Sequence, residues 1–388
     1  MNKKTRIILI VLAVIFFGIA IKELHTEFPD LQMPLINKYL GDEKPSINGS
    51  PYKTYYYELS NVEKQAYNLV LESIYDLPEK ILVPDLTSGE LDEVFKALLN
   101  DNPDLFFLGR KCSLKAELWN DFISFEYIMT KEEYDRKNSE LKLKRDMVIS
   151  QLTDKNDQWQ TELEIHDYIV SHCSYKLEDN DFNYSSAYGC LVNGKAACEG
   201  YSKAAKYIFD KVGIESALIS GTAQGNGEKP GEHMWNIVKI NNDYYHLDCT
   251  WDDPVSNSKD GVKLYTYFNL SDEAIGINHF QFSYDPGCDS MDENYYVKKN
   301  LCFENYSKAD ENRLREVLLK EYNSGEKFIQ INFVTKKSYD NAHADLVENK
   351  KIVSLLNNVR SNLGTTLSRR FVGYYENAEL YTLTFLFK

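Results

Sequence analysis

Apolar residues recur at helical spacing in several parts of the chain. This spacing predicts helices at 62–75, 90–99, 131–152, 310–322 and, as a further helical region, 339–359. Runs rich in β-branched and aromatic residues predict strands at 105–108, 122–128, 264–271, 328–334, 370–375 and 380–387. A mixture of helices and strands of this kind indicates an α/β or α+β fold.

The stretch 194–254 places a cysteine, a histidine and an aspartate on three predicted elements. Cys198 opens an amphipathic run that ends at Gly213, a signal for the C-terminus of a helix. A thiol at a helix N-terminus faces unpaired backbone N–H groups and the positive end of the helix dipole, which favours the thiolate. Cys198 is therefore a candidate nucleophile.

Two β-forming runs, 234–240 and 244–251, follow and are separated by Asn241 and Asn242. If these asparagines form a two-residue hairpin turn, Trp235 faces Asp248, and His233 lies two residues along on the same sheet face. The diagonal separation is then about 7 to 8 Å or less, which lets the carboxylate orient the imidazole. A register change of one residue would place His233 and Asp248 on opposite faces.

Three short motifs follow one another within roughly 60 residues. They are Cys-Glu-Gly-Tyr at 198–201, Glu-His-Met-Trp-Asn at 232–236 and Tyr-His-Leu-Asp-Cys-Thr-Trp at 245–251. They resemble motifs of the transglutaminase-like superfamily, and 165–170 and 188–191 resemble the segments that precede the nucleophile in bacterial members. The resemblance spans about 159–288. It implies an α+β, papain-like or transglutaminase-like core, in which the helix bearing the nucleophile packs on an antiparallel sheet, flanked by smaller α/β segments.

The resemblance implies a catalytic triad of Cys198, His233 and Asp248. Cys198 would attack an amide carbonyl, His233 would move the proton, and Asp248 would hold the imidazole tautomer. The backbone N–H of Cys198 is the natural oxyanion donor. The resemblance also implies a second, side-chain donor, for which the candidates are Tyr175, Tyr184 and Tyr188.

Other residues near these motifs have alternative roles. His246 shares the predicted sheet face of Asp248 and could compete as the base, whereas Cys249 alternates to the opposite face and is expected to be a core thiol. The tryptophans at 235 and 251 are expected either to wall the cleft or to pack in the core. The glycine-rich loop 221–231 is expected to gate the substrate.

The sequence indicates no cofactor and no metal site. It contains neither a Cys-x-x-Cys motif nor a paired histidine spacing. Glu232, Asp252 and Asp253 could suggest calcium, but acidic residues near a turn are commonly solvated, and we expect that here. The six cysteines other than Cys198 could form up to three disulfides or remain free thiols.

The N-terminus begins with basic residues followed by an apolar run at 7–21. The run is short for a spanning helix, which needs about 20 residues, but flanking lysine and arginine side chains can snorkel. We expect an uncleaved anchor, with a cleaved signal as the alternative, and the remaining chain outside the membrane. The predicted parts are an anchor or signal at 1–24, a linker at 25–55, an N-terminal α/β module at 56–154, the catalytic core at 155–290 and a C-terminal α/β module at 300–388.

The net charge of -15, with acidic residues spread along the chain, argues against a nucleic-acid partner. We therefore expect a membrane-anchored, extracytoplasmic or secreted cysteine enzyme. Its substrate would be a protein or peptide amide, which it would hydrolyse or transfer to an amine. The alternative is a noncatalytic module on the same fold that binds a peptide or cell-wall polymer. The sequence leaves the oligomeric state open.

Overall fold

The structure is a computed structural model that describes residues 49–117, 120–177, 182–225, 229–253, 262–324, 327–363 and 370–388. The described residues all belong to one compact unit. The predicted N-terminal apolar segment and residues 25–48 of the predicted linker lie outside the described residues. Within the described ranges, no helix has the length and apolar character needed to cross a membrane.

The first described part combines helices with a three-stranded antiparallel sheet of order β1-β3-β2. Its elements are α3 (Thr54–Glu58), α4 (Asn61–Ser73), the 3-10 helix η1 (Ile74–Asp76), β1 (Ile81–Val83), α5 (Ser88–Asp101), β2 (Leu108–Glu117) and β3 (Asn120–Tyr127). Ser60 and Thr87 cap α4 and α5 in reciprocal hydrogen bonds with a glutamate three residues on. Of the predicted strand at 105–108, only Leu108 lies in a strand, where β2 begins, because consecutive turns bond Leu105 N–H to Asn102 O and Leu108 N–H to Leu105 O.

The central part contains a five-stranded sheet of order β10-β6-β7-β8-β9, in which all neighbours are antiparallel. Its strands are β6 (Ser216–Ala223), β7 (Gly231–Ile240), β8 (Asp243–Leu247), β9 (Phe268–Leu270) and β10 (His279–Phe280). The other elements are α6 (Lys131–Gln151), α7 (Gln158–His172), the parallel pair β4 (Ser174–Tyr175) and β5 (Lys195–Ala196), the π-helix η2 (Gly189–Asn193), α8 (Cys198–Val212) and α9 (Asp272–Ile275). The predicted strand at 264–271 is confirmed only at 268–270.

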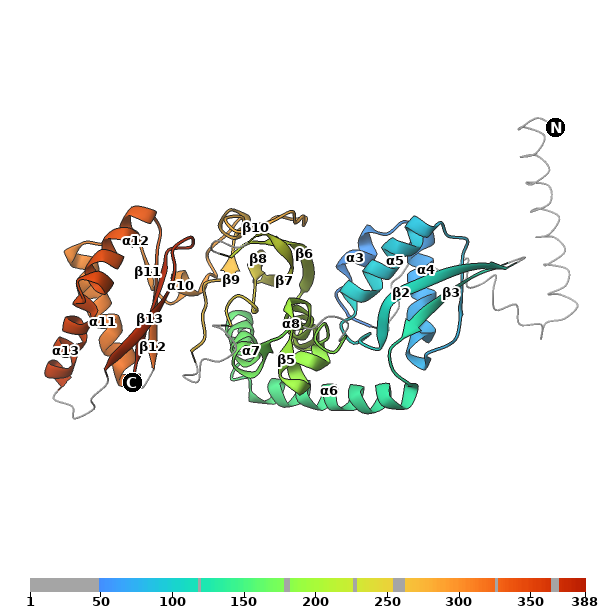
Figure 1. Cartoon of the computed structure of the whole chain (residues 1–388), viewed down its shortest axis with the longest axis horizontal. Helices are drawn as coiled ribbons and strands as arrows, with labels where there is room; N and C mark the ends of the chain where they lie inside the picture. The colour runs from blue at the N-terminus through green and yellow to red at the C-terminus, as the bar shows by residue number, and fades with distance from the viewer. Residues whose placement is uncertain are drawn as a thin grey trace, which may run out of the picture. The chain divides into compact units, whose positions relative to one another are not determined.

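Helix α8 packs against β6 and β7 (Figure 1). Its sequence produces this contact because Ala204, Ala205, Ile208 and Phe209 lie on one face and are fully buried. Gly213 ends the helix in the left-handed conformation, with φ of 84°. The predicted fold class is therefore confirmed: the helix bearing the candidate nucleophile packs on an antiparallel sheet.

The C-terminal part builds a separate four-stranded sheet, of order β11-β12-β14-β13, with helices against one face (Figure 1). Its elements are α10 (Tyr295–Lys298), β11 (Cys302–Phe303), α11 (Lys308–Ser324), β12 (Phe328–Phe333), α12 (Lys336–His343), the π-helix η3 (Ala344–Glu348), α13 (Lys351–Leu363), β13 (Phe371–Asn377) and β14 (Thr382–Phe387). The predicted helical region at 339–359 is interrupted, because Lys350 adopts a φ of 56°.

The C-terminal part has a hydrophobic cluster of its own, apart from the largest cluster of the described residues. One cluster joins buried residues from Tyr56 to Leu301, so the first part and the central part share a core. The other joins buried residues from Phe303 to Phe387. The exact limits of the predicted modules at 56–154, 155–290 and 300–388 stay a prediction.

Candidate active site

The hairpin of β7 and β8 decides which side chains meet. Ile240 pairs with Asp243, so Asn241 and Asn242 form the predicted two-residue turn, and Asn241 adopts the positive φ of 58° that asparagine tolerates. The same register pairs Asn236 with Leu247. The next pair along would bring residue 235 opposite residue 248, as the sequence predicts.

Strand β8 ends at Leu247, earlier than the predicted strand at 244–251. The cause is the Asp248 side chain, whose Oδ1 accepts the backbone N–H groups of Thr250 and Trp251 at 2.9 and 3.2 Å. This local turn replaces the hydrogen bonds of a sheet. It also leaves Oδ2 of Asp248 as the oxygen available to other partners.

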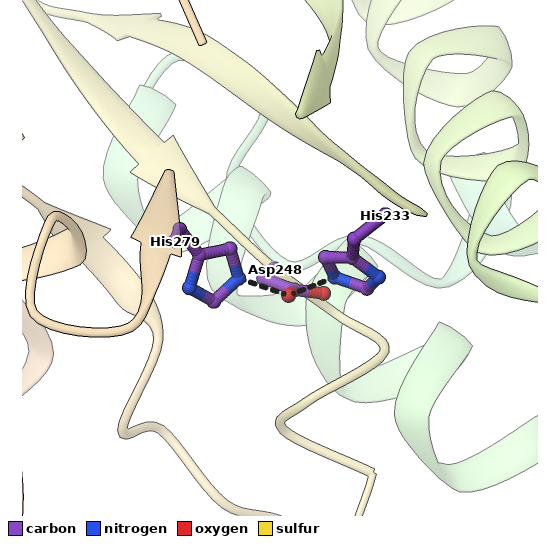
Figure 2. Close-up of side chains that lie close together, drawn as sticks. All are labelled: His233, Asp248 and His279. Carbon is purple, nitrogen blue, oxygen red and sulfur yellow. Dashed lines mark hydrogen bonds and ion pairs between the residues drawn. The ribbon is translucent and has the colours of Figure 1, made fainter. Parts of the chain in front are cut away.

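His233 and Asp248 meet through that second oxygen (Figure 2). His233 Nε2 lies 2.7 Å from Asp248 Oδ2, and the two side chains are 8% and 1% exposed. Burial would lower the pKa of His233, but Asp248 and then Cys198 outweigh it and raise the pKa to about 10. Burial would raise the pKa of Asp248, but His233 and His279 hold it below its ordinary range. The pair is therefore an imidazolium facing a carboxylate at neutral pH.

Cys198 is the first residue of α8, directly after the N-cap Ala197, and is partly exposed. It lies close enough to His233 to raise the pKa of that imidazole through a hydrogen bond and through its charge. Since Asp248 occupies Nε2 of His233, Nδ1 is the nitrogen left for the thiol. Gly200 allows this helix start, because a Cβ there would lie 2.5 Å from the carbonyl oxygen of Tyr184.

The three tyrosines considered as a second oxyanion donor have different surroundings. The Tyr188 hydroxyl donates to Glu140 Oε2 at 2.5 Å and so has another partner. The Tyr184 ring lies beneath a lysine ammonium. Tyr175 is 43% exposed, and burial and then the charge of Cys198 raise its pKa. Tyr175 is therefore the strongest of the three candidates.

His246 does not compete with His233 as a base. Its Nδ1 lies 2.9 Å from Trp235 Nε1, and its Nε2 lies 2.7 Å from Asp272 Oδ1. An indole N–H can only donate, so Nδ1 accepts and Nε2 carries the proton that is donated to Asp272. Both nitrogens of this buried ring are occupied, and Trp235, fully buried, is a core residue rather than a wall of the cleft.

Sequence reasoning missed His279. Its Nε2 lies 3.1 Å from Asp248 Oδ2, so two imidazoles share one carboxylate oxygen (Figure 2). His279 reaches this position because β10 pairs with β6, where it stands opposite Ala223. No local pattern indicates a pairing between such distant segments.

The described residues contain two clusters whose potential metal ligands lie within 4.8 Å of one another: His233 with Asp248 and His279, and His246 with Asp272 and Cys288. In the second cluster, the proton on Nε2 of His246 leaves no lone pair for a metal. In the first, a metal ion would replace the hydrogen bond between His233 and Asp248. The hydrogen-bonded arrangement therefore fits both clusters better than a metal does.

The acidic residues that could suggest calcium are not all solvated, contrary to our expectation. Asp252 is fully buried and its Oδ2 lies 3.2 Å from Nε2 of His166. Asp253 accepts a 2.6 Å hydrogen bond from the Tyr201 hydroxyl. These two carboxylates stabilise the core, whereas Glu232 is exposed.

All seven cysteines lie among the described residues and are free thiols. Cys249 is buried, which confirms the predicted core thiol. Besides Cys198, only Cys112 and Cys302 are partly exposed. Burial raises the pKa of the Cys112 thiol to about 11 and also raises that of Cys302.

The family comparison agrees with the motifs. Residues 145–249 match the sequence model of the transglutaminase-like superfamily. A solved structure described as "a TGase" is 16% identical, with 43% of this chain and 49% of that chain covered and a TM-score of 0.26. Another, described as "a Putative Cysteine Protease from Cytophaga hutchinsonii", is 10% identical, with 36% and 61% covered and a TM-score of 0.24.

This chain thus spans about half of the first of those proteins and about three fifths of the second. A comparison with curated proteins gave no match. The matched residues 145–249 contain Cys198, His233 and Asp248. The chain therefore carries a transglutaminase-like superfamily domain at residues 145–249.

Proposed function

We propose that the chain is a cysteine enzyme of transglutaminase-like type that acts on protein or peptide amides through Cys198, His233 and Asp248. The observation that carries this proposal is the 2.7 Å hydrogen bond from His233 Nε2 to Asp248 Oδ2, which leaves Nδ1 for the thiol at the start of α8. The superfamily match over the same residues supports it. An imidazolium beside a thiol favours the thiolate, which is the nucleophilic form.

The first half of the reaction forms a thioester. The Cys198 thiolate attacks the carbonyl carbon of the amide, and the resulting oxyanion accepts hydrogen bonds from the Cys198 backbone N–H and from the Tyr175 hydroxyl. His233 donates its Nδ1 proton to the departing nitrogen, so the C–N bond breaks and an amine leaves. Asp248 keeps the imidazole oriented throughout.

The second half releases the acyl group. His233, now neutral, takes a proton from water or from a second amine, which attacks the thioester carbonyl. Breakage of the C–S bond returns Cys198 as thiolate and His233 as imidazolium. Water gives hydrolysis and an amine gives a new amide, so access of the acceptor to the thioester decides the product.

We also infer that the enzyme works outside the cytoplasm, anchored through its N-terminus. This inference rests on the basic start and the apolar run at 7–21. Fractionation of cells that express the full chain tests it. Recovery in the membrane fraction, with the C-terminus accessible to added protease in intact cells, is the expected result, and a protease-protected C-terminus would contradict it.

The function is tested by mass spectrometry of glutamine-containing peptides incubated with the protein, with and without a primary amine. We expect a mass gain from amine incorporation, or deamidation or backbone cleavage, and its loss in Cys198→Ala. Incorporation would identify a transferase, and deamidation or cleavage alone a hydrolase. No product from a diverse peptide set, with equal peptide retention by both proteins, would contradict the enzyme and favour a binding module.

A further inference from the structure

A chain of hydrogen bonds links the Asp248 carboxylate to the C-terminal part of the protein. His279 Nε2 lies 3.1 Å from Asp248 Oδ2, and His279 Nδ1 lies 2.8 Å from Asn278 Oδ1. Asn278 Nδ2 in turn donates to Glu379 Oε2 at 2.9 Å. Glu379 lies in the connection between β13 and β14, so a residue of the C-terminal part reaches the candidate triad through two side chains.

Glu379 fixes the orientation of the Asn278 amide. An ionised carboxylate can only accept, so the amide atom that faces Glu379 must be the NH2 group. The same group donates to Tyr267 Oη at 2.9 Å. Tyr267 Oη also accepts from Asn377 Nδ2 at 3.1 Å, and Asn377 Oδ1 accepts the backbone N–H of Glu379 at 3.1 Å. These bonds leave Oδ1 of Asn278 to face His279.

The orientation of Asn278 determines where His279 carries its proton. Asn278 Oδ1 can only accept, so Nδ1 of His279 must be protonated. Nε2 then faces Asp248 either as the second N–H of an imidazolium, which donates to Oδ2, or as a lone pair, which makes no hydrogen bond with the carboxylate. Burial lowers the pKa of His279, Asp248 opposes this effect, and the charge of His233 reinforces it. Protonation of His279 and protonation of His233 therefore compete for one carboxylate.

The connection that carries Glu379 is held against the central part by apolar packing. Leu380 is 8% exposed and belongs to a buried cluster with Tyr267 and Ile275. Trp251 packs against this cluster, and its ring centroid lies 4.6 Å from that of His279. This packing already holds the backbone that carries Glu379. Less conformational entropy is therefore lost when the Glu379 carboxylate accepts its hydrogen bond from Asn278.

We propose that Glu379 is a positioning residue for the triad: through the Asn278 amide it holds the His279 proton on Nδ1 and so sets how His279 meets Asp248. The C-terminal part then takes part in arranging the reactive groups. The placement of the proton follows from the hydrogen bonds alone, whereas its catalytic consequence rests on the function proposed above.

Loss of the Glu379 carboxylate should change the proton position. Without it, the Asn278 amide can turn over and present its NH2 group to Nδ1 of His279, which then accepts. The neutral ring would carry its proton on Nε2 and donate it to Asp248 Oδ2. This hydrogen bond, which the neutral wild-type ring cannot make, would compete with the one from His233 for the same oxygen and weaken the support of the catalytic imidazole.

The test is nitrogen-15 NMR of the full chain labelled at histidine, which separates protonated from unprotonated ring nitrogens. We expect a protonated Nδ1 on His279 in the wild type, and a shift of the proton to Nε2 in Glu379→Ala. Glu379→Gln keeps an acceptor and should retain the wild-type signals. Glu376→Ala is the matched control, because Glu376 lies in the adjoining strand β13 and bonds the Tyr339 hydroxyl instead.

An unprotonated Nδ1 in the wild type would overturn the proposal, as would unchanged His279 signals in Glu379→Ala. The signals are assigned with His279→Gln. If that variant does not fold, variants of the other histidines assign them by elimination.

Peptide turnover by the same variants tests the catalytic consequence. Loss of one hydrogen bond in the chain predicts a fall in kcat of roughly two- to tenfold for Glu379→Ala, with KM unchanged and with recovery in Glu379→Gln. An equal fall of kcat in Glu376→Ala would mean that the loss comes from the β13–β14 hairpin as a whole. That result would overturn the positioning role of Glu379. If the wild type shows no turnover beyond Cys198→Ala, the proposed function fails, while the NMR result still decides where the His279 proton lies.

Discussion

His233 in β7 and His246 in β8 each make a 2.7 Å hydrogen bond to an aspartate, yet they have different chemical capacities. His233 Nε2 bonds Asp248, and its Nδ1 is left for the Cys198 thiol. His246 Nε2 bonds Asp272, but its Nδ1 is occupied by the indole of Trp235. The comparison teaches that the group facing the second ring nitrogen, rather than the histidine–aspartate pair itself, decides whether the imidazole can move a proton.

A third pair extends the comparison. His166 is fully buried with a carboxylate near each nitrogen, Asp252 at 3.2 Å and Asp167 at 3.4 Å. Burial would lower its pKa, but the two aspartates raise it to about 9. His166 is therefore a charged structural group, with no nitrogen directed at a reactive partner.

The largest expected effect comes from removing the reactive partner of His233. Cys198→Ala should reduce turnover by roughly 10⁴-fold or more, because no other group can form the covalent intermediate. Steady-state kinetics with a reactive peptide measure the change. Cys112→Ser, which alters another partly exposed thiol, is the control and should retain turnover. Residual thioester formation in Cys198→Ala would contradict the assignment.

The second-largest expected effect distinguishes the role of Asp248 from that of Asp272. Asp248→Asn should lower kcat by roughly 10²- to 10⁴-fold, since an amide does not stabilise the imidazolium. Asp272→Asn should leave kcat unchanged and lower the free energy of unfolding by about 1 to 2 kcal/mol, the contribution of one hydrogen bond. The measurements are kcat and denaturant unfolding of both variants. Similar losses of kcat would remove the distinction between the two pairs.

The third prediction concerns the charge of His166. Its folded pKa of about 9 exceeds the ordinary value of 6.5, so its contribution to stability is fully present below about pH 6.5 and is lost as the pH rises through about 9. The loss should reach at most roughly 3 kcal/mol. Unfolding curves across this pH range measure it, with His166→Gln as the comparison. His233 contributes in the same direction, so only the part that disappears in His166→Gln belongs to His166.

The smallest effect concerns the indole that occupies His246. Trp235→Phe keeps an aromatic ring but removes the donor to His246 Nδ1, which should lower the free energy of unfolding by about 1 kcal/mol. The freed imidazole should not rescue His233→Ala, because the thiol beside it belongs to the buried Cys288 and not to Cys198. Unfolding and turnover of the single and double variants check both points. Turnover restored in the double variant would show that His246 can serve as a base.

Local sequence patterns predicted the parts of the site that depend on neighbouring residues. The asparagine pair at 241–242 fixed the hairpin register and hence the approach of His233 to Asp248. Glycine at 213 and the apolar face of the preceding run predicted the helix that begins at Cys198. These features depend on turn chemistry and periodicity, which a single sequence displays.

The remaining features depend on contacts between distant segments or on side chains that override a pattern. His279 reaches Asp248 through the pairing of β10 with β6, and Glu379 reaches Asn278 from the connection between β13 and β14. Asp248 ends its own strand by bonding the backbone that follows it. Local periodicity carries no signal for any of these, so the sequence predicted a longer strand and a triad without its second histidine.

The most direct test of the central claim is the alkylation rate of each cysteine, followed by peptide mapping. We expect Cys198 to react first at about pH 6, well before Cys112 and Cys302, whose thiols burial holds in the protonated form. The rate at Cys198 should fall in Asp248→Asn and stay unchanged in Asp272→Asn. Equal rates at the three cysteines, or a Cys198 rate indifferent to Asp248→Asn, would contradict the account.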